Sequence, residues 1–330
     1  MIHTVPAPLL SVVIVSWESG KDLVECVRSL AGAAAAIGHE RLELIVVDNG
    51  SRDFPAEEVR RVWAPVLLIG NPENRGFGPA ANQGAGRAGA PMVLFLNPDT
   101  RADGEPFGPL LEAFQRHPDA VAVAPRLLES GTAADETQAM FQLRRLPTWR
   151  QALGELLLLD RAFPRRRALL HRRYADRDRE QPFEVEQPAA AALAVRREAF
   201  LKIGGFDEAF VPAWFEDVDL CARLAPLGSL LYWPDARFVH AGGAAARALG
   251  YDRFLPIYYR NAIRYWRKHR GPLAASAFHA LVAAGMGLRL LILPLRPRVP
   301  RPRSEAGRAY LWTLQMACGL GGGRSPAARA

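Results

Sequence analysis

The sequence predicts an α/β protein with a doubly wound, mostly parallel central sheet and an appended C-terminal helical region. The first observation is that short apolar runs alternate with longer amphipathic segments along residues 9–125. The second is that these runs are continuous and rich in β-branched residues, which is typical of parallel strands buried on both faces. The third is that 330 residues with 49% apolar content suffice for one large domain or two small ones.

The predicted elements follow one another in order along the chain. Residues 9–17 form a continuous apolar run and are expected to be the first strand. Residues 22–37 are Ala-rich and amphipathic, and are expected to be the first helix. The same reasoning predicts further strands at residues 42–47, 66–69, 91–96, 120–124 and 191–195, and further helices at residues 55–63, 79–88 and 105–116.

Acidic residues end three of these strands: Glu18, Asp48 and Asp99. Ligands of open α/β sheets bind beyond the carboxyl ends of the strands, so these carboxylates are expected to lie near a ligand. No Gly-x-Gly-x-x-Gly follows the first strand and no Gly-Lys-Ser/Thr loop occurs, which disfavours a dinucleotide or P-loop site. Carboxylates instead bind phosphate through a divalent cation, or accept the imide N–H of uracil or thymine.

A second acidic group occupies residues 214–221, where Glu216, Asp217 and Asp219 fall within four positions. The cluster lies in otherwise core-like sequence, where carboxylates are costly to bury without a compensating partner. A metal ion, a sugar hydroxyl that gives up its proton, or a helix N-terminus can each supply that partner. The residues alone leave these three alternatives open.

Several short motifs occur in a fixed order along residues 9–270. They are Val46-Val47-Asp48-Asn49-Gly50-Ser51, Asn74-Arg75-Gly76-Phe77-Gly78, Asn97-Pro98-Asp99, Gly204-Gly205-Phe206-Asp207-Glu208, Phe215-Glu216-Asp217-Val218-Asp219 and His240 before Gly242-Gly243. As a set they resemble the family 2 glycosyltransferases, and most of all their rhamnosyltransferase-type branch. The resemblance implies a GT-A fold and an inverting transfer from a nucleotide-activated sugar.

The resemblance also implies residue roles. Asp217 takes the position of the catalytic base, and Asp99 would coordinate Mg²⁺ or Mn²⁺ on the diphosphate with His240 as a further metal ligand. Glu216, Asp219 and Trp214 would shape the acceptor pocket or support the base. The residues expected around the nucleotide sugar are Ser16, Glu18, Asp48, Asn49, Ser51, Asn74, Gly76, Phe77, Asn82, Asn97 and Asp99, with Asp48 on the pyrimidine base.

The expected donor is dTDP-L-rhamnose, and the expected acceptor is a growing glycan or a lipid-linked sugar. A UDP-hexose or UDP-galactofuranose donor, or a non-catalytic protein that binds sugar nucleotides, are the alternatives. The sequence departs from the family pattern at Glu18, which replaces Asn, at Asn97, which replaces the first Asp of Asp-x-Asp, and at Ala190, which replaces Gly.

Each single motif also has a purely structural explanation. Asp48 suits an Asx turn at a strand end, and Asn82 suits a helix surface. His240, between Val239 and Ala241, suits a satisfied core histidine, and Trp214 suits core packing. The order of the motifs favours the functional interpretation most for Asp99 and Asp217.

The net charge of +8 is unevenly distributed. Residues 144–179 carry eleven Arg against four acidic residues, and residues 260–330 carry thirteen Arg or Lys against Glu305 alone. The rest of the chain is therefore acidic. The basic segments lack the interleaved aromatics of a nucleic-acid site, so we expect an anionic membrane surface and no nucleic acid as partner.

The predicted organisation is a catalytic domain at residues 1–270 and an apolar helix with a basic tail at residues 271–330. The catalytic domain would contain a nucleotide-binding half at about 9–125, a basic insert at about 141–183 and an acceptor half at about 184–270. Residues 273–295 are apolar enough to approach a membrane span, with Arg289 near the end, where it can snorkel.

No signal peptide is visible, and Cys26, Cys221 and Cys318 form neither a ligand pair nor a disulfide framework. These features predict a cytoplasmic enzyme, peripheral or monotopic at the inner face of the cell membrane.

Overall fold

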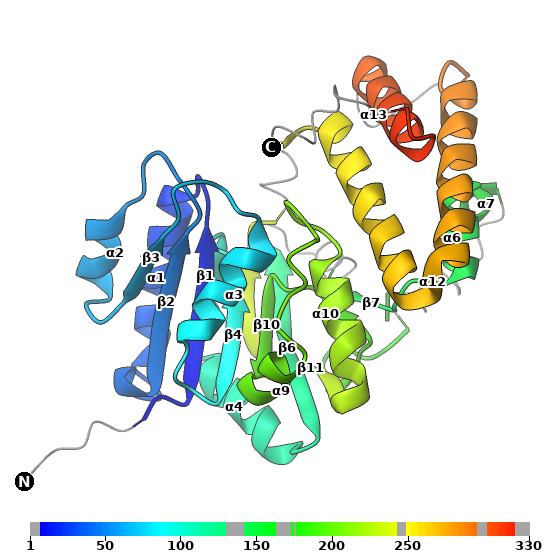
Figure 1. Ribbon diagram of the computed structural model, residues 1–330. Coiled ribbons are helices and arrows are strands. Elements are labelled where there is room, and N and C mark those ends of the chain that lie inside the picture. The colour runs from blue at the N-terminus through cyan, green and yellow to red at the C-terminus, as the bar shows by residue number, and fades with distance from the viewer. Residues whose placement is uncertain are drawn as a thin grey trace, which may run out of the picture. The chain divides into compact units, whose positions relative to one another are not determined.

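The computed structural model describes residues 7–129, 142–162, 173–174, 176–242, 249–295 and 302–320 (Figure 1). The chain divides into two compact units. Unit 1 comprises Met1–Leu146 and Leu170–Gly242, and unit 2 comprises Pro147–Leu169 and Gly243–Ala330. This division falls at Gly242 and passes through the predicted basic insert, whereas the sequence analysis places a boundary at residue 270. One long helix, α12 Tyr251–Ile292, continues through residue 270.

Unit 1 is built on a mixed sheet in the order β3-β2-β1-β4-β10-β6-β11-β5, with β8 paired to β11. Its strands are β1 Leu10–Ser16, β2 Leu42–Asp48, β3 Leu67–Gly70, β4 Met92–Leu96, β5 Thr100–Ala102, β6 Ala120–Glu129, β8 Phe183–Glu184, β10 Ala192–Arg196 and β11 Ser229–His240. A second, two-stranded sheet pairs β7 Leu143–Arg144 with β9 Gln187–Pro188. The predicted α/β fold class is therefore confirmed.

The helices of unit 1 connect and cover these strands (Figure 1). They are α1 Gly20–Ala34, α2 Ala56–Val62, α3 Phe77–Arg87, α4 Phe107–Arg116, α9 Arg197–Lys202 and α10 Glu216–Leu224, with the short 3₁₀ turns η1 His39–Arg41 and η2 Ala225–Leu227. Each strand and helix predicted along residues 9–125 is present, with ends shifted by a few residues, and β6 extends beyond its predicted end at residue 124.

The sheet has a hydrophobic core on each face because successive strand residues point to opposite sides. Val12 and Ile14 pack in one core with α1 and α4, whereas Val13 packs in the other with α3, α9 and α10. Gly84 on α3 lies so close to Val13 that a Cβ atom there would clash with the valine methyl groups. A small residue at position 84 therefore allows α3 to lie directly on the sheet.

Strand direction divides the sheet into two parts. The first four strands in the order β3-β2-β1-β4 are parallel, as predicted. Strand β10 then runs antiparallel to both β4 and β6, while β6 and β11 are parallel to each other. An apolar run reports burial but not direction, so the sequence did not reveal this insertion. It places Ala192 opposite Leu96, and so brings the segment before β10 next to the residues that follow β4.

Unit 2 is helical. It contains α6 Trp149–Leu156, α7 Leu159–Ala162, α12 Tyr251–Ile292 and α13 Arg303–Ala317. Gly271 interrupts the regular backbone of α12 with a φ of 84°, immediately before Pro272. The rings of Trp149, Trp266 and Phe278 pack together, with centroids 4.4 to 6.4 Å apart. In the described part of the chain, α12 is the one helix long and apolar enough to cross a membrane by length and composition.

Arg289 on α12 contacts the end of α6. Its guanidinium donates to the carbonyl oxygens of Leu156 at 2.6 Å and Glu155 at 2.8 Å. These carbonyls belong to the last turn of α6, where Arg289 acts as a cap. The expectation that Arg289 snorkels to a membrane surface stays a prediction. The basic positions Arg165, Arg172 and Arg296 lie outside the described residues.

Candidate functional site

Asp99 and His240 come together at the carboxyl end of β4. The chain turns through Asn97-Pro98-Asp99 and continues as β5, which pairs antiparallel with the end of β11 so that Thr100 lies opposite His240. His240 Nε2 lies 3.1 Å from Asp99 Oδ1, and it lies 3.3 Å from Asn97 Nδ2. About a tenth of each of the Asp99 and His240 side chains is exposed. The predicted pairing of Asp99 with His240 is thus formed by strand pairing across 141 residues.

The electrostatics of this pair suit a cation. Burial acts to raise the pKa of Asp99, but the hydrogen bond and charge of His240 and the backbone amides of Asp99 and Gly242 hold it below its usual value. Asp99 is therefore a carboxylate at neutral pH. The described residues contain no group of three or more His, Cys, Asp or Glu side chains arranged to hold a metal. A metal held here would have two protein ligands, with oxygens of the substrate and water completing the shell.

The spacing of the two donor atoms fits such an ion. Adjacent ligands at about 2.1 Å from an octahedral Mg²⁺ lie about 3 Å apart. The observed 3.1 Å between Asp99 Oδ1 and His240 Nε2 has this value. One hard oxygen donor and one imidazole nitrogen are compatible with Mn²⁺ as well.

Asp217 lies in the first turn of α10, and both of its carboxylate oxygens have partners. Oδ1 accepts the backbone N–H of Val218 at 2.8 Å. Oδ2 accepts the side-chain amide of Gln187 at 3.2 Å and lies 3.6 Å from Nη2 of Arg144. The side chain is 13% exposed. The carboxylate of Asp217 is therefore held in one orientation and is still partly accessible to solvent.

Glu216 differs from Asp217 although the two are adjacent. It is 8% exposed, and its Oε2 atom is buried without a hydrogen-bond partner in the described residues. Burial, together with the charge of Asp217, raises the pKa of Glu216 well above its usual value, against the opposing effects of its own backbone amide and Arg144. Of the two neighbouring carboxyl groups, Glu216 is thus the one that favours its protonated form.

This difference predicts a pH dependence of stability that belongs to Glu216. A carboxyl group with a raised pKa in the folded state stabilises the fold below its unfolded pKa, near 4.5, and this contribution is lost as pH rises through the folded value. Glu216→Gln has no group to titrate. Its free energy of unfolding, relative to wild type, is therefore expected to increase as pH rises above 4.5. Urea unfolding at about pH 4.5, 6 and 8 measures this difference.

The control for that measurement is Glu57→Gln, because Glu57 is exposed on α2 and forms a surface pair with Arg60. It is expected to change stability by less than about 0.5 kcal/mol at each pH. A Glu216→Gln difference that stays constant with pH would contradict the burial argument.

A short segment connects the surroundings of Asp99 with those of Asp217. Ala191 O accepts the backbone N–H of Asn97 at 2.9 Å, and Gln187, four residues earlier, donates to Asp217. Four extended residues span at most about 14 Å. Ala190, 6% exposed, lies within this segment. The segment 187–191, which leads into β10, therefore contacts Asp217 at one end and the turn that carries Asp99 at the other.

Five of the residues predicted to contact the nucleotide sugar lie at the carboxyl ends of β1 and β2: Ser16, Glu18, Asp48, Asn49 and Ser51. Asp48 Oδ1 accepts the backbone N–H of Ser51 at 3.1 Å, and the hydroxyl of Ser51 accepts the backbone N–H of Glu18 at 3.0 Å. The hydroxyl of Ser16 lies 2.8 Å from that of Ser19. One oxygen of Asp48 therefore stabilises the turn after β2, by a bond to the residue three positions on and not to the second residue as in an Asx turn.

Asn49 shapes the next loop. It is 2% exposed and uses both ends of its amide. Its Nδ2 donates to Asn74 Oδ1 at 2.9 Å and to Gly76 O at 3.2 Å, and its Oδ1 accepts from Arg75 N at 3.1 Å. These contacts hold residues 74–76 at the end of β2, directly before α3.

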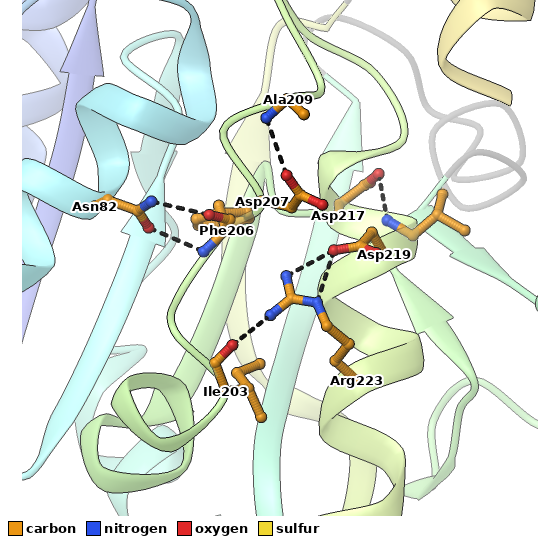
Figure 2. Close-up of polar contacts among 9 residues, drawn as sticks. Asn82, Ile203, Phe206, Asp207, Ala209, Asp217, Asp219 and Arg223 are labelled. Atoms are coloured by element: carbon orange, nitrogen blue, oxygen red, sulfur yellow. Dashed lines mark hydrogen bonds and ion pairs between the residues drawn. The ribbon is translucent and has the colours of Figure 1, made fainter. Parts of the chain in front are cut away.

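Asn82 on α3 forms hydrogen bonds with the loop that contains Phe206 (Figure 2). Its side chain accepts the N–H of Phe206 and donates to the C=O of Phe206, both at 2.9 Å, and donates to Glu208 at 3.1 Å. Gly205 has a φ of 72°, and a Cβ atom there would lie 2.5 Å from Asn82 Oδ1. Asn82 is therefore half-buried and bonded to the backbone of Phe206, and is not simply a residue of a helix surface.

The turn before α10 has an unusual backbone. Trp214 and Phe215 both adopt left-handed conformations, with φ of 72° and 73°. Such conformations cost about 1–3 kcal/mol each in non-glycine residues and cluster at functional sites. The turn is linked to the donor side because Phe77 N donates to Pro212 O at 2.9 Å. Trp214, predicted to face the acceptor, is half-buried in this turn.

Asp219 occupies a different environment from Asp217. Its side chain is fully buried and accepts from Arg223 Nε at 2.7 Å, while the same guanidinium donates to Ile203 O at 2.9 Å (Figure 2). Asp219 thereby connects α10 to the end of α9. Of the three clustered carboxylates, only Asp217 combines exposure with an orientation fixed on both oxygens.

Sequence reasoning missed Arg144 and Gln187. They lie 43 residues apart and belong to strands of two residues each, which have no periodic signature. The only available signal was the unpaired basic charge of the segment that begins at residue 144.

Residues 11–203 match the family described as Glycosyl transferase family 2. This chain belongs to that family. The glycosyltransferase is 30% identical over 247 residues to N-acetylglucosaminyl-diphospho-decaprenol L-rhamnosyltransferase of Mycobacterium tuberculosis, covering 70% of this chain and 76% of the relative. It is also 27% identical over 120 residues to poly-beta-1,6-N-acetyl-D-glucosamine synthase of Staphylococcus aureus, covering 35% of this chain and 29% of that protein.

Solved structures agree with this family at the level of the fold. A mannosyltransferase from Pyrobaculum calidifontis in complex with GDP-Man and Mn²⁺ superposes with a TM-score of 0.53 at 17% identity, covering 95% of this chain and 87% of that one. GalNAc-T7 with UDP, GalNAc and Mn²⁺ superposes with a TM-score of 0.52 at 16% identity, covering 71% of this chain and 43% of that one. The glycosyltransferase thus has the GT-A fold that the sequence predicts.

Proposed function

We propose that this glycosyltransferase transfers L-rhamnose from dTDP-L-rhamnose, with inversion, to a hydroxyl of a glycan or lipid-linked acceptor in cell-surface polysaccharide synthesis. The observation that carries the proposal is the arrangement of two acidic sites, Asp99 with His240 and Asp217, on either side of residues 187–191. The mycobacterial relative, whose name gives a rhamnose transfer to a diphospho-decaprenol-linked sugar, supports the donor and the acceptor class.

Asp217 is the general base of this reaction. In a single displacement with inversion the acceptor hydroxyl attacks the face of the sugar opposite the leaving diphosphate, so its proton must be taken up on that side. A carboxylate that is held by Val218 N and Gln187, and is still partly exposed, is suited to accept that proton. Glu216 is less suited to this role, because it is buried and burial raises its pKa.

Asp99 and His240 would hold a divalent cation, Mg²⁺ or Mn²⁺. When bound, the ion offsets the negative charge that develops on the leaving diphosphate. Asp48, at the end of β2, would accept the imide N–H of the pyrimidine through the oxygen that does not take part in its turn with Ser51. The loop held by Asn49 would present Asn74 and Gly76 to the donor.

Unit 2 would attach the enzyme to the cytoplasmic face of the membrane without crossing it. Supporting this, Leu273, Leu291 and Leu295 along and after α12 are 86%, 73% and 80% exposed. The basic residues 296–301 that follow, which suit anionic headgroups, lie outside the described residues. A peripheral location would bring a lipid-linked acceptor to the enzyme.

Nucleotide titration tests the donor and the metal site together. With Mn²⁺ present, dTDP is expected to bind more tightly than UDP in calorimetry, and removal of the metal with EDTA is expected to abolish most of the affinity. Asp99→Ala should weaken Mn²⁺-dependent binding about 10²-fold or more, because a metal contributes several kcal/mol of charge stabilisation.

The matched control is Asp103→Ala, since Asp103 is an acidic residue of the same segment that pairs with Arg237 at the surface. It is expected to bind as wild type does. Tighter binding of UDP than of dTDP would contradict rhamnose as the sugar, and binding that is indifferent to both EDTA and Asp99→Ala would contradict the metal site.

A further inference from the structure

The small β7–β9 sheet places two side chains on one oxygen of Asp217. Arg144 and Gln187 are register partners in this antiparallel pair. Residues opposite each other in such a pair extend to the same face, so their side chains can meet a common target. Gln187 Nε2 lies 3.2 Å and Arg144 Nη2 lies 3.6 Å from Oδ2 of Asp217. The proposed base is thus held by residues from three separate segments: Arg144, Gln187 and Val218.

The groups around Asp217 come from α10, β7 and β9. On α10 itself, Glu216 and the thiol of Cys221 are both buried, and burial with the charge of Asp217 raises the pKa of each. Both shifts favour the uncharged forms of these groups. Asp219, also on α10, is paired with Arg223. Arg144 is the charged group that approaches Asp217 from β7, and Gln187 from β9 is uncharged.

We propose that Arg144, with Gln187, is a positioning residue of the transfer reaction, which holds the Asp217 carboxylate in place and orients it toward the acceptor hydroxyl. The proposal rests on the proposed function of Asp217 as the base. A 3.6 Å approach from a guanidinium that is 33% exposed is a charge contact that water screens in part. The hydrogen bond from Gln187 provides the direction, and Arg144 provides the charge.

The chain offers a matched control at the next residue. Arg145 directly follows the end of β7. Its guanidinium lies 2.6 Å from Glu186 and 4.6 Å from the centroid of the Tyr174 ring, so these contacts involve partners other than Asp217. Arg145→Gln removes the same charge from the neighbouring residue, and leaves the contact with Asp217 in place.

The experiment measures steady-state kinetics of the full-length protein with dTDP-L-rhamnose, Mn²⁺ and an N-acetylglucosaminyl-diphospho-lipid acceptor. Arg144→Gln is expected to lower kcat on the order of 10²-fold, as expected for a misplaced catalytic group, with the KM for the donor unchanged. Arg144→Lys keeps the charge and is expected to recover part of the loss. Gln187→Leu keeps Arg144 and is expected to lose about tenfold in kcat. Arg145→Gln is expected to turn over as wild type does.

Three results would overturn the proposal: an unchanged kcat in Arg144→Gln, an equal loss in Arg145→Gln, or a loss confined to the donor KM. If Arg144→Gln does not fold, the kcat and donor KM of Gln187→Leu are compared with those of wild type and Arg145→Gln by the same criteria. Asp217→Asn is assayed in parallel. Normal turnover of Asp217→Asn would refute the base, and the positioning role with it, whereas an inactive Asp217→Asn beside a fully active Arg144→Gln refutes only the positioning role.

Discussion

Asp217→Asn is expected to lower the turnover of this glycosyltransferase by about 10²–10⁴-fold, the usual cost of removing a general base. The amide has nearly the same shape as the carboxylate and can keep the contact with Val218 N, but it cannot take up the proton of the acceptor hydroxyl. Nucleotide binding is expected to stay at the wild-type level, because the proposed role of Asp217 is on the acceptor side. Transfer kinetics and calorimetric titration with dTDP measure the two quantities separately.

Asp119→Asn is the control, because Asp119 is an acidic residue of unit 1 whose side chain bonds the hydroxyl of Ser229 at the surface. It is expected to be fully active. Near-normal turnover of Asp217→Asn would reject the base assignment and leave a non-catalytic binder of sugar nucleotides as the better description. A parallel loss of nucleotide binding would show that the substitution disturbs the fold more widely than the contacts of Asp217 suggest.

Asp219→Ala is expected to destabilise the protein by about 3–5 kcal/mol, the cost of removing one partner of a buried ion pair. Asp219 has no exposed surface, and only 18% of the Arg223 side chain is exposed, so the remaining guanidinium would stay buried without its carboxylate. The contact of Arg223 with Ile203 O, which connects α10 to the end of α9, would weaken with it. Urea unfolding followed by circular dichroism measures the change.

Glu112→Ala provides the comparison, since Glu112 and Arg116 form a pair with the same helical spacing on the surface of α4. Its loss is expected to cost no more than about 0.5 kcal/mol. The double replacement Asp219→Leu with Arg223→Met is expected to be less harmful than Asp219→Ala, because it leaves no unpaired charge. A cost for Asp219→Ala similar to that for Glu112→Ala would show that Asp219 is not essential to the packing of α10.

Asp217→Asn and Asp219→Ala test two different roles within one acidic cluster of the sequence. Asp217 is partly exposed and lies on the proposed reaction path, Asp219 is a structural partner of Arg223, and Glu216 is buried and favours its protonated form. Asp217 lies one residue from Glu216 and two residues from Asp219, and on a helix such neighbours point in different directions. Helical geometry therefore separates the partly exposed Asp217 from the two buried carboxyl groups, which are three residues apart.

The sequence by itself determined the order of strands and helices along residues 9–125. The spacing of apolar residues and the length of each apolar run indicate which side chains are buried and whether a segment is a strand or a helix. It also indicated that Asp48 and Asp99 stand at carboxyl ends of strands, because each follows a continuous apolar run. The family and the GT-A fold followed from the order of the motifs, and the comparisons confirm both.

Only the tertiary structure decided how these parts meet. The antiparallel direction of β10, the contact of His240 with Asp99, and the support of Asp217 by Arg144 all depend on strand pairing between distant segments. Hydrophobic pattern records which residues are buried, but it does not record which strand lies beside which. The identity of a partner across a sheet therefore appears only when the chain is folded.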